Sequence, residues 1–321
     1  MQAISIYEPV REELARVEDN LKGLTNARFP FLAQLLRHVF ESEGKRVRPA
    51  ITLLSSKFHP NDGQKAEVMA TAVELLHIAT LIHDDTVDNS DVRRGRATIS
   101  SLWGRNVAIL VGDYIFATSA TFVCDTDNVR VIRRFSETIM ELASGELQEI
   151  AEVYNWDQSV QDYLDRIYNK TASLFATAGE SGAVLSGAPE EISQALKEYS
   201  YNIGLAFQII DDILDFEGTA EEIGKPVGTD LSHGIFTLPA IIAMQRYPHD
   251  NPIPPLFQHP QDEECLKRAV DMIQNSQSIG DSYAVAEKIC GKARNALMTL
   301  PRNPSRDALE ELVGYLLTRR K

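Results

Sequence analysis

The stretch QKAEVMATAVELLHIATLIHDDTVDN, residues 64–89, indicates the architecture of this chain. Its apolar residues recur at spacings of three and four: Val68, Ala72, Leu75, Leu76, Ala79 and Ile82. That spacing predicts an α-helix with a wide apolar face. The same periodicity occurs in residues 105–123, 130–153, 160–186, 190–216, 232–247, 262–276, 281–299 and 305–319. Alternating runs of β-branched residues are scarce, so we expect an all-α protein of about ten or more helices and no strand.

Two segments interrupt the helical pattern. Residues 217–230, EGTAEEIGKPVGTD, predict a Gly-rich loop between two helices. Residues 247–261 contain five prolines, which a helix interior does not accommodate. This stretch is either a linker between two domains or a surface loop of one domain. We favour the surface loop because only 60 residues follow it, and we therefore expect one single domain over residues 1–321.

The composition excludes several classes of protein. The 321 residues are 44% hydrophobic, which supplies a core and excludes intrinsic disorder. The formal net charge of −14 argues against binding to nucleic acid, which requires a broad basic surface. The three cysteines (Cys124, Cys265 and Cys290) show no CxxC spacing, so neither a disulfide framework nor a zinc site is expected.

The sequence also bears on location. No stretch approaches the ~18 uninterrupted apolar residues of a membrane span. The N-terminal residues lack the basic and apolar regions of a signal peptide and are too acidic for a transit peptide. We expect a cytoplasmic protein with no transmembrane segment.

Two copies of the pattern Asp-Asp-x-x-Asp interrupt apolar helical segments. The copies are Asp84, Asp85 and Asp88, and Asp211, Asp212 and Asp215. On a helix, the first and last aspartate of each copy lie one turn apart on one face, where like charges repel. A single copy fits a solvated acidic helix end. Two matched copies favour a cation between carboxylates, and oxygen ligands together with substrate phosphates suit Mg²⁺.

Clustered cations point to a phosphate-bearing substrate. GKRVRP contains Lys45, Arg46 and Arg48, and RRGR after the first acidic cluster contains Arg93, Arg94 and Arg96. Arginine forks bind phosphate oxygens bidentately, whereas lysine acts as a point charge. Either cluster alone fits a solvated charge run, but beside paired carboxylates they predict a substrate with two phosphates.

Four single residues have open interpretations. Lys170 and Lys225 lie among small or apolar neighbours, where a lysine either needs a partner or extends its ammonium group into water. His77 lies two turns before Asp84 and is either a satisfied core residue or part of the site. Gln208 lies three residues before Asp211 and is either a buried amide or a group that contacts the substrate.

Five motifs in this order resemble those of the trans-isoprenyl diphosphate synthases, the polyprenyl synthetases. The motifs are GKRVRP, ELLHIATLIHDDTVDNSDVRRG, NKTASLF, GLAFQIIDDILDF and IGKPVGTDL, and the resemblance runs from residue 44 to about residue 239. The resemblance implies a prenyltransferase that elongates an allylic diphosphate with isopentenyl diphosphate to a linear all-trans polyprenyl diphosphate. It also implies an all-α bundle of the isoprenoid synthase type around a deep central cavity, and a homodimer.

The resemblance assigns roles to individual residues. It implies bridging Mg²⁺ ions on Asp84, Asp88 and Asp211, with Asp85, Asp212 and Asp215 ligating directly or through water. It places isopentenyl diphosphate among Lys45, Arg48, His77 and Arg94. It places the allylic diphosphate against Arg93, Lys170 and Lys225, with Thr171 and Gln208 lining the reacting region. Ile235 departs from the pattern, because family members commonly carry a lysine there, so one cation expected at the allylic site is missing.

The expected reaction needs no side-chain nucleophile. An allylic C–O bond ionises, Mg²⁺ and cationic side chains stabilise the departing diphosphate, the isopentenyl double bond attacks, and a proton leaves. A terpene cyclase would share the fold but normally carries a different second metal motif. A weakly active regulatory subunit would typically lose one aspartate motif or the basic residues, and both are intact here.

Product length is expected to depend on residues upstream of the first acidic cluster. Farnesyl producers of the family often place aromatic rings five and four positions before the first aspartate, where this chain has Ala79 and Thr80. Small residues there leave a channel open, with Leu76 and Phe116 as candidates for a deeper floor. The alternative is that the small residues only allow close helix packing. We predict a product of geranylgeranyl length or longer, with a long-chain polyprenyl diphosphate favoured.

Overall fold

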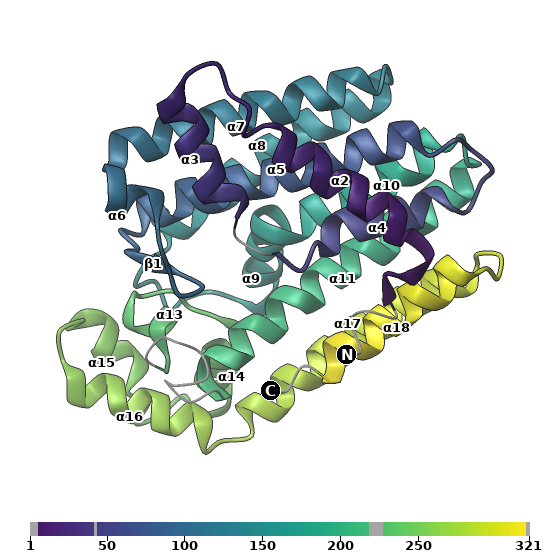
Figure 1. The fold of residues 1–321 in the computed structure, drawn as a ribbon. Coiled ribbons are helices and arrows are strands. Elements are labelled where there is room, and N and C mark those ends of the chain that lie inside the picture. The colour runs from purple at the N-terminus through teal and green to yellow at the C-terminus, as the bar shows by residue number, and fades with distance from the viewer. Residues whose placement is uncertain (1–5, 42–43, 218–226, 319–321) are drawn as a thin grey trace. The chain divides into compact units, whose positions relative to one another are not determined.

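The computed structural model describes residues 6–41, 44–217 and 227–318, and nearly all of its regular structure is helical (Figure 1). The chain divides into two compact units. Residues Met1–Ser136, Thr177–Lys197 and Leu300–Leu309 form the first unit, and residues Glu137–Ala176, Glu198–Thr299 and Glu310–Lys321 form the second. Helices α8 (Val129–Ala151), α10 (Ser173–Leu185), α11 (Glu190–Glu217) and α18 (Pro304–Thr318) contribute residues to both units.

The first unit is built around helix α5 (Gln64–Val87). Helix α5 packs against α2 (Arg11–Gly23), α4 (Val47–Ser56) and α7 (Arg105–Asp125). Its central residues Ala72, Val73 and Leu75 are fully buried, because the apolar face predicted from the sequence is covered by these neighbours. The remaining elements of the unit are η1 (Glu8–Val10), α3 (Pro30–Phe40), β1 (Val92–Arg93), β2 (Arg96–Ala97) and α6 (Ile99–Trp103).

The second unit contains α9 (Val160–Ile167), the π-helical turn η2 (Tyr168–Ala172), α13 (Thr229–Ser232), α14 (Leu238–Arg246), α15 (Ile253–Gln258), α16 (Glu263–Gln274) and α17 (Ser278–Met298). Helix α14 packs against α9, α16 and α17. Helix α9 begins with a capping box: the Ser159 side chain accepts from the Asp162 N–H, and the Asp162 side chain accepts from the Ser159 N–H. This cap fixes where α9 begins.

The all-α fold class is confirmed, but the expectation of no strand is wrong. Strands β1 and β2 form an antiparallel hairpin that pairs Val92 with Ala97 and Arg93 with Arg96. Arg94 and Gly95 form its turn with φ of 51° and 75°, the left-handed pair that suits a two-residue hairpin. Two residues per strand are too few to show an alternating pattern in the sequence.

The structure also corrects the predicted helices at three places. The predicted helix 160–186 contains the π-helical turn η2. The predicted helix 232–247 begins only at Leu238, because Thr237 is extended and caps it. Helix α15 occurs inside the proline-rich segment, with Pro254 and Pro255 in the first turn, where backbone N–H groups have no partner within the helix.

Two described helices are long and apolar enough to cross a membrane by length and composition alone. In α5, 61% of the most apolar 18-residue window is buried, as in a core helix. In α7 the buried share is 33%. The expectation of no transmembrane segment therefore stays a prediction, as does the expectation of a single domain.

Candidate active site

The first acidic cluster lies at the C-terminal end of helix α5. Asp84 is half-buried, Asp85 is buried, and Asp88 is exposed just beyond the last helical residue. The Asp88 N–H donates to the Asp84 carbonyl at 2.8 Å, which completes the last turn. Asp84 and Asp88 therefore lie one turn apart, as their spacing predicts.

The hairpin β1–β2 follows this helix end and carries the predicted diphosphate arginines. The Ser90 N–H donates to the Asp85 carbonyl at 2.9 Å, which fastens the start of the hairpin to α5. The Arg93 guanidinium donates to the Asp85 carboxylate at 2.7 Å, whereas Arg94 is exposed in the turn. A diphosphate that binds Arg93 must therefore compete with Asp85.

His77 lies among the cations of the first unit. Burial, followed by the positive charges of Arg48, Arg94 and Arg93, lowers the pKa of His77 well below its ordinary value. The imidazole is therefore neutral at pH 7 and adds no charge to this group of cations. The family resemblance groups His77 with Lys45, Arg48 and Arg94, and in the structure Arg48 and Arg94 lie close enough to His77 to lower its pKa.

The three cations of GKRVRP have different surroundings. Arg46 forms ion pairs with Glu18 and with Glu74, the latter at 2.6 Å, and has a left-handed backbone with φ of 48°. Lys45 is exposed, and its carbonyl accepts from the Tyr7 hydroxyl at 2.8 Å. Arg46 thus serves the fold, which leaves Lys45 and the half-buried Arg48 as the candidates for substrate phosphate.

The second acidic cluster lies on helix α11. Asp211 and Asp215 are half-buried one turn apart, and Asp212 is buried. The Asp212 carboxylate accepts from the Tyr163 hydroxyl at 2.6 Å and from the Gln208 amide at 2.7 Å. Burial raises the pKa of Asp212 to about 7, although these two hydrogen bonds favour the charged form. Each Asp212 carboxylate oxygen accepts one of these hydrogen bonds and has a second lone pair.

The π-helical turn η2 positions Lys170 and Thr171. The Lys170 ammonium pairs with Glu149 at 2.5 Å and with Glu146 at 3.2 Å, both on α8. The Thr171 hydroxyl donates to the Gln208 carbonyl oxygen at 2.7 Å. The sequence indicated that Lys170 needs a partner but did not identify the two glutamates.

Two glycines allow neighbouring helices to approach this turn closely. A Cβ on Gly145 of α8 would lie 2.6 Å from the Lys170 backbone nitrogen. A Cβ on Gly204 of α11 would lie 2.6 Å from the Ala172 Cα. Both separations are shorter than a real Cβ contact, so only glycine lets Glu149 reach Lys170 and Gln208 reach Thr171.

Asp230 is an acidic neighbour that the sequence argument missed as a site residue, although GTDL was among its motifs. The Asp230 N–H donates to the Asp215 carboxylate at 3.2 Å. Burial, together with the charges of Asp215 and Asp212, raises the pKa of Asp230 well above its ordinary value. Ile235, which stands where the family commonly has lysine, donates its N–H to the Asp230 carbonyl at 2.9 Å.

The remaining predicted residues are Lys225 and the four candidates for setting product length. Lys225 falls outside the described residues. Leu76 and Ala79 are buried on α5, Thr80 is half-buried there and donates its hydroxyl to the His77 carbonyl, and Phe116 is half-buried on α7.

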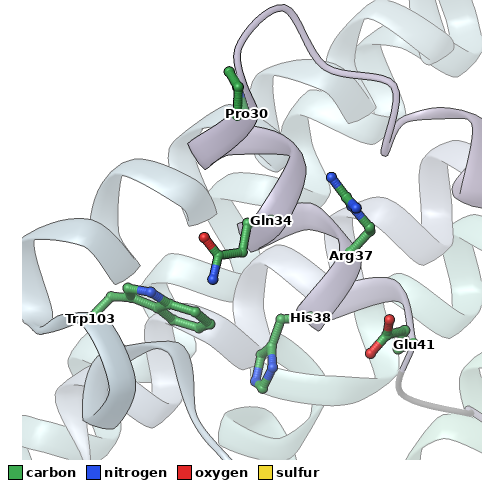
Figure 2. A pocket seen from close by; sticks show the side chains of 6 residues that line it. All are labelled: Pro30, Gln34, Arg37, His38, Glu41 and Trp103. Atoms are coloured by element: carbon green, nitrogen blue, oxygen red, sulfur yellow. The ribbon is translucent and has the colours of Figure 1, made fainter.

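A hollow of about 490 Å³ between α3 and α6 contains no predicted site residue. Figure 2 shows its lining by Pro30, Gln34, Arg37, His38, Glu41 and Trp103.

The donor set suits a hard cation that shares its coordination with a substrate. Within residues 6–41, 44–217 and 227–318, no group of three or more His, Cys, Asp or Glu side chains is placed to hold a metal by itself. Each cluster offers paired carboxylates one helical turn apart with arginine or lysine nearby. Mg²⁺ is typically held in this way, by one or two carboxylates and substrate phosphates.

The helical fold and the two acidic clusters define the class of helical isoprenoid synthases. Residues 29–273 match the family model described as Polyprenyl synthetase, and the chain belongs to this family. It is 40% identical to a prenyl transferase of Synechocystis sp., with 98% of each chain covered. It is 36% identical to heptaprenyl diphosphate synthase component 2 of Bacillus subtilis, with 97% of this chain and 89% of that protein covered.

A solved structure agrees with this membership. The crystal structure of polyprenyl synthase from Caulobacter crescentus, complexed with calcium and isoprenyl diphosphate, superimposes with a TM-score of 0.93. The two chains are 32% identical over 99% of this chain and 98% of the other. The predicted family and the predicted enzyme class, a prenyltransferase that forms a polyprenyl diphosphate, are confirmed.

Proposed function

We propose that this chain repeatedly adds isopentenyl diphosphate to an allylic diphosphate and releases a linear all-trans polyprenyl diphosphate longer than geranylgeranyl. The observation that carries this proposal is the pair of aspartate clusters, each on a largely buried helix of a polyprenyl synthetase chain. The name of the heptaprenyl relative supports a long product. The small side chain of Ala79 at the predicted channel position agrees with it.

The metal is proposed to be Mg²⁺, with Asp84 and Asp88 as ligands in the first acidic cluster and Asp211 as a ligand in the second. The paired carboxylates fit a hard divalent cation. The polyprenyl synthase from Caulobacter crescentus is complexed with calcium, which supports a divalent cation in this chain too. When bound, Mg²⁺ would supply stabilisation for the negative charge of the departing diphosphate.

The chain's own cations are proposed to bind the two diphosphates. Arg48 and Arg94, with neutral His77, would hold isopentenyl diphosphate together with Lys45. Arg93 and Lys170 would hold the allylic diphosphate, together with Lys225. In the free protein, carboxylates engage Arg93 and Lys170, which keeps both cations oriented before substrate binds. Each incoming phosphate would then exchange one anionic partner for another, so burying these cations incurs little extra cost.

The remaining steps need an apolar environment and a proton acceptor. Buried apolar side chains such as Leu76 and Ala79 would exclude water from the allylic cation in a deep cavity. Loss of a proton completes each addition, and the departed diphosphate is proposed as the acceptor. No side-chain nucleophile takes part in this sequence of steps.

The test is an assay of the purified chain alone with an allylic diphosphate, isopentenyl diphosphate and Mg²⁺. We expect elongated diphosphates longer than twenty carbons by mass spectrometry. Cyclised hydrocarbons would show a terpene cyclase instead. No product from the chain alone would indicate a subunit that needs a partner, an outcome to consider because one relative is named as a component.

A homodimer and a cytoplasmic location are further parts of the proposal. The homodimer rests on the family resemblance, and light scattering of the purified chain tests it. The location stays a prediction, and fractionation of cells that express the native chain tests it.

A further inference from the structure

Four side chains of the second unit form a continuous chain of hydrogen bonds. The Tyr163 hydroxyl donates to Asp212 Oδ2 at 2.6 Å, and Gln208 Nε2 donates to Asp212 Oδ1 at 2.7 Å. The Thr171 hydroxyl donates to Gln208 Oε1 at 2.7 Å. Three elements, α9, η2 and α11, contribute to this chain, and every member except Gln208 is buried.

The direction of these hydrogen bonds is fixed by the carboxylate. The Gln208 amino group donates to Asp212 Oδ1, and this hydrogen bond sets the orientation of the whole amide. The amide oxygen of Gln208 then faces Thr171, whose single hydroxyl hydrogen is used on it. Thr171 Oγ1 can therefore act only as an acceptor toward a further neighbour. Gln208 Oε1 likewise has a second lone pair that can accept.

Tyr163 is itself held in place. Its ring is fully buried, and the Arg166 guanidinium lies 5.8 Å from the ring centre. Arg166 donates to Gln158 at 2.6 Å and to the Phe236 carbonyl at 2.7 Å. These hydrogen bonds fix Arg166, and Arg166 together with the buried surroundings keeps the Tyr163 ring in one orientation. The far end of the hydrogen-bond chain is therefore anchored in the interior of the unit.

We propose that Tyr163 is a positioning residue for prenyl transfer, which acts through Asp212 to keep Thr171 and Gln208 as acceptors toward the allylic cation. This inference rests on the proposed function, in which Thr171 and Gln208 line the reacting region. Oxygen lone pairs in a fixed orientation stabilise positive charge as it develops and need no reorganisation. Without the Tyr163 hydroxyl, Asp212 turns toward another donor, and the Gln208 amide is released from its single orientation.

A binding experiment separates this role from a purely structural one. Tyr163→Phe keeps the buried ring and removes only the hydroxyl. Isothermal titration calorimetry with Mg²⁺ present compares two ligands of equal length. One is a thio-linked allylic diphosphate that does not ionise, and the other is a diphosphate in which a protonated tertiary amine replaces the reacting carbon. We expect the variant to bind the amine about tenfold more weakly and the neutral analogue within about twofold of wild type.

Tyr283→Phe is the matched control, because the Tyr283 hydroxyl also donates to a carboxylate of α11, Glu217, in the same unit. That variant is expected to bind both ligands as wild type does. Equal loss of both ligands in Tyr163→Phe, or no selective loss, would overturn the proposal. A wild type that binds neither ligand would instead overturn the proposed function, and this inference with it.

A second measurement tests whether the two ends of the chain act through one another. Tyr163→Phe and Thr171→Val are each expected to lower kcat more than KM, and the double variant is expected to be no worse than the worse single variant. Multiplied losses would show independent residues and refute the proposal. Thr171→Ser, which restores the hydroxyl, is expected to restore the coupling. Should Tyr163→Phe fail to fold, Gln208→Leu provides a selective-binding test of the same chain, since it removes the amide that links Asp212 to Thr171 and is not assigned to the metal.

Discussion

Asp84 and Asp211 begin two carboxylate pairs that differ in their surroundings but share one spacing. We predict that Asp84→Asn and Asp211→Asn each lower kcat at least about 100-fold, because a neutral amide is a poor ligand for a hard divalent cation. Steady-state assays at saturating Mg²⁺ measure the effect. Asp125→Asn, at the exposed end of α7, is the control and should retain activity. Near-normal turnover in both variants would refute the metal assignment.

His77 gives the protein a defined response to acid. Its pKa is lowered by burial and by Arg48, Arg94 and Arg93, so below pH of about 6.5 the unfolded chain takes up a proton that the folded protein does not. The folded state therefore loses stability as the pH falls through that range and regains it as the pH rises.

For His77→Gln we predict a smaller loss of unfolding free energy between pH 6.5 and 5, by up to about 1 kcal/mol, than wild type shows. Urea denaturation at a series of pH values measures it, and the curves should run parallel above pH of about 7.5. His249→Gln, which replaces an exposed histidine, is the control. Identical pH dependence in wild type and His77→Gln would contradict the prediction.

Removing one of the Lys170 ion pairs is predicted to strengthen the binding of the allylic substrate. Glu149→Gln removes a carboxylate that pairs with Lys170 and that, in the proposed site, would compete with the allylic diphosphate for this lysine. We expect the KM for the allylic substrate to fall by a factor of about 2–5, the size of a partly exposed ion pair, with the KM for isopentenyl diphosphate unchanged. A rise in the allylic KM would show that Glu149 serves mainly to orient Lys170.

At the scale of elements, the π-helical turn depends on close packing of α11 through Gly204. Gly204→Ala introduces a methyl group 2.6 Å from the Ala172 Cα, and we predict a destabilisation of about 1–3 kcal/mol together with lost activity. Gly291→Ala, in the interior of α17 with open space at its Cβ, is the matched control. It should raise stability by up to about 1 kcal/mol, because alanine favours a helix. Thermal unfolding of both variants measures the difference.

The sequence predicted most helices because apolar periodicity is a local property that each segment carries by itself. It failed where backbone conformation departs from the pattern, as in the left-handed turn at Arg94 and the extended residue Thr237. The same division applies to the site. The aspartates and arginines are visible as motifs, whereas Glu149, Tyr163 and Asp230 acquire their roles only from tertiary neighbours. No spacing rule connects Tyr163 to Asp212, 49 residues away.

At the scale of the whole molecule, the proposed product length is a property of the packed pair α5 and α7. Ala79 is 1% exposed on α5, so a ring at this position must occupy interior space. We predict that Ala79→Phe shifts the product toward farnesyl length, because a ring there would close the channel about one helical turn, ~5 Å, from the aspartates. Chromatography of the dephosphorylated products measures the chain length.

The control for this prediction places the same ring outside the first unit's core. Ala117→Phe lies on the exposed face of α7 and should leave the product unchanged. A thermal melt of each variant establishes that it is folded. A wild type that stops at farnesyl, or an Ala79→Phe product of unchanged length, would show that this position does not set the length.

The π-helical turn at Tyr168–Ala172 has a consequence for how this sequence tolerates insertions and deletions. A π turn behaves as one extra residue within an α-helix, and each residue rotates the following helix by about 100°. Deleting one residue there would let α9 and α10 continue as one regular helix, with Tyr163 and Thr171 turned out of common reach of α11. For the stability of the fold, substitutions at this turn are expected to be far better tolerated than any change in its length.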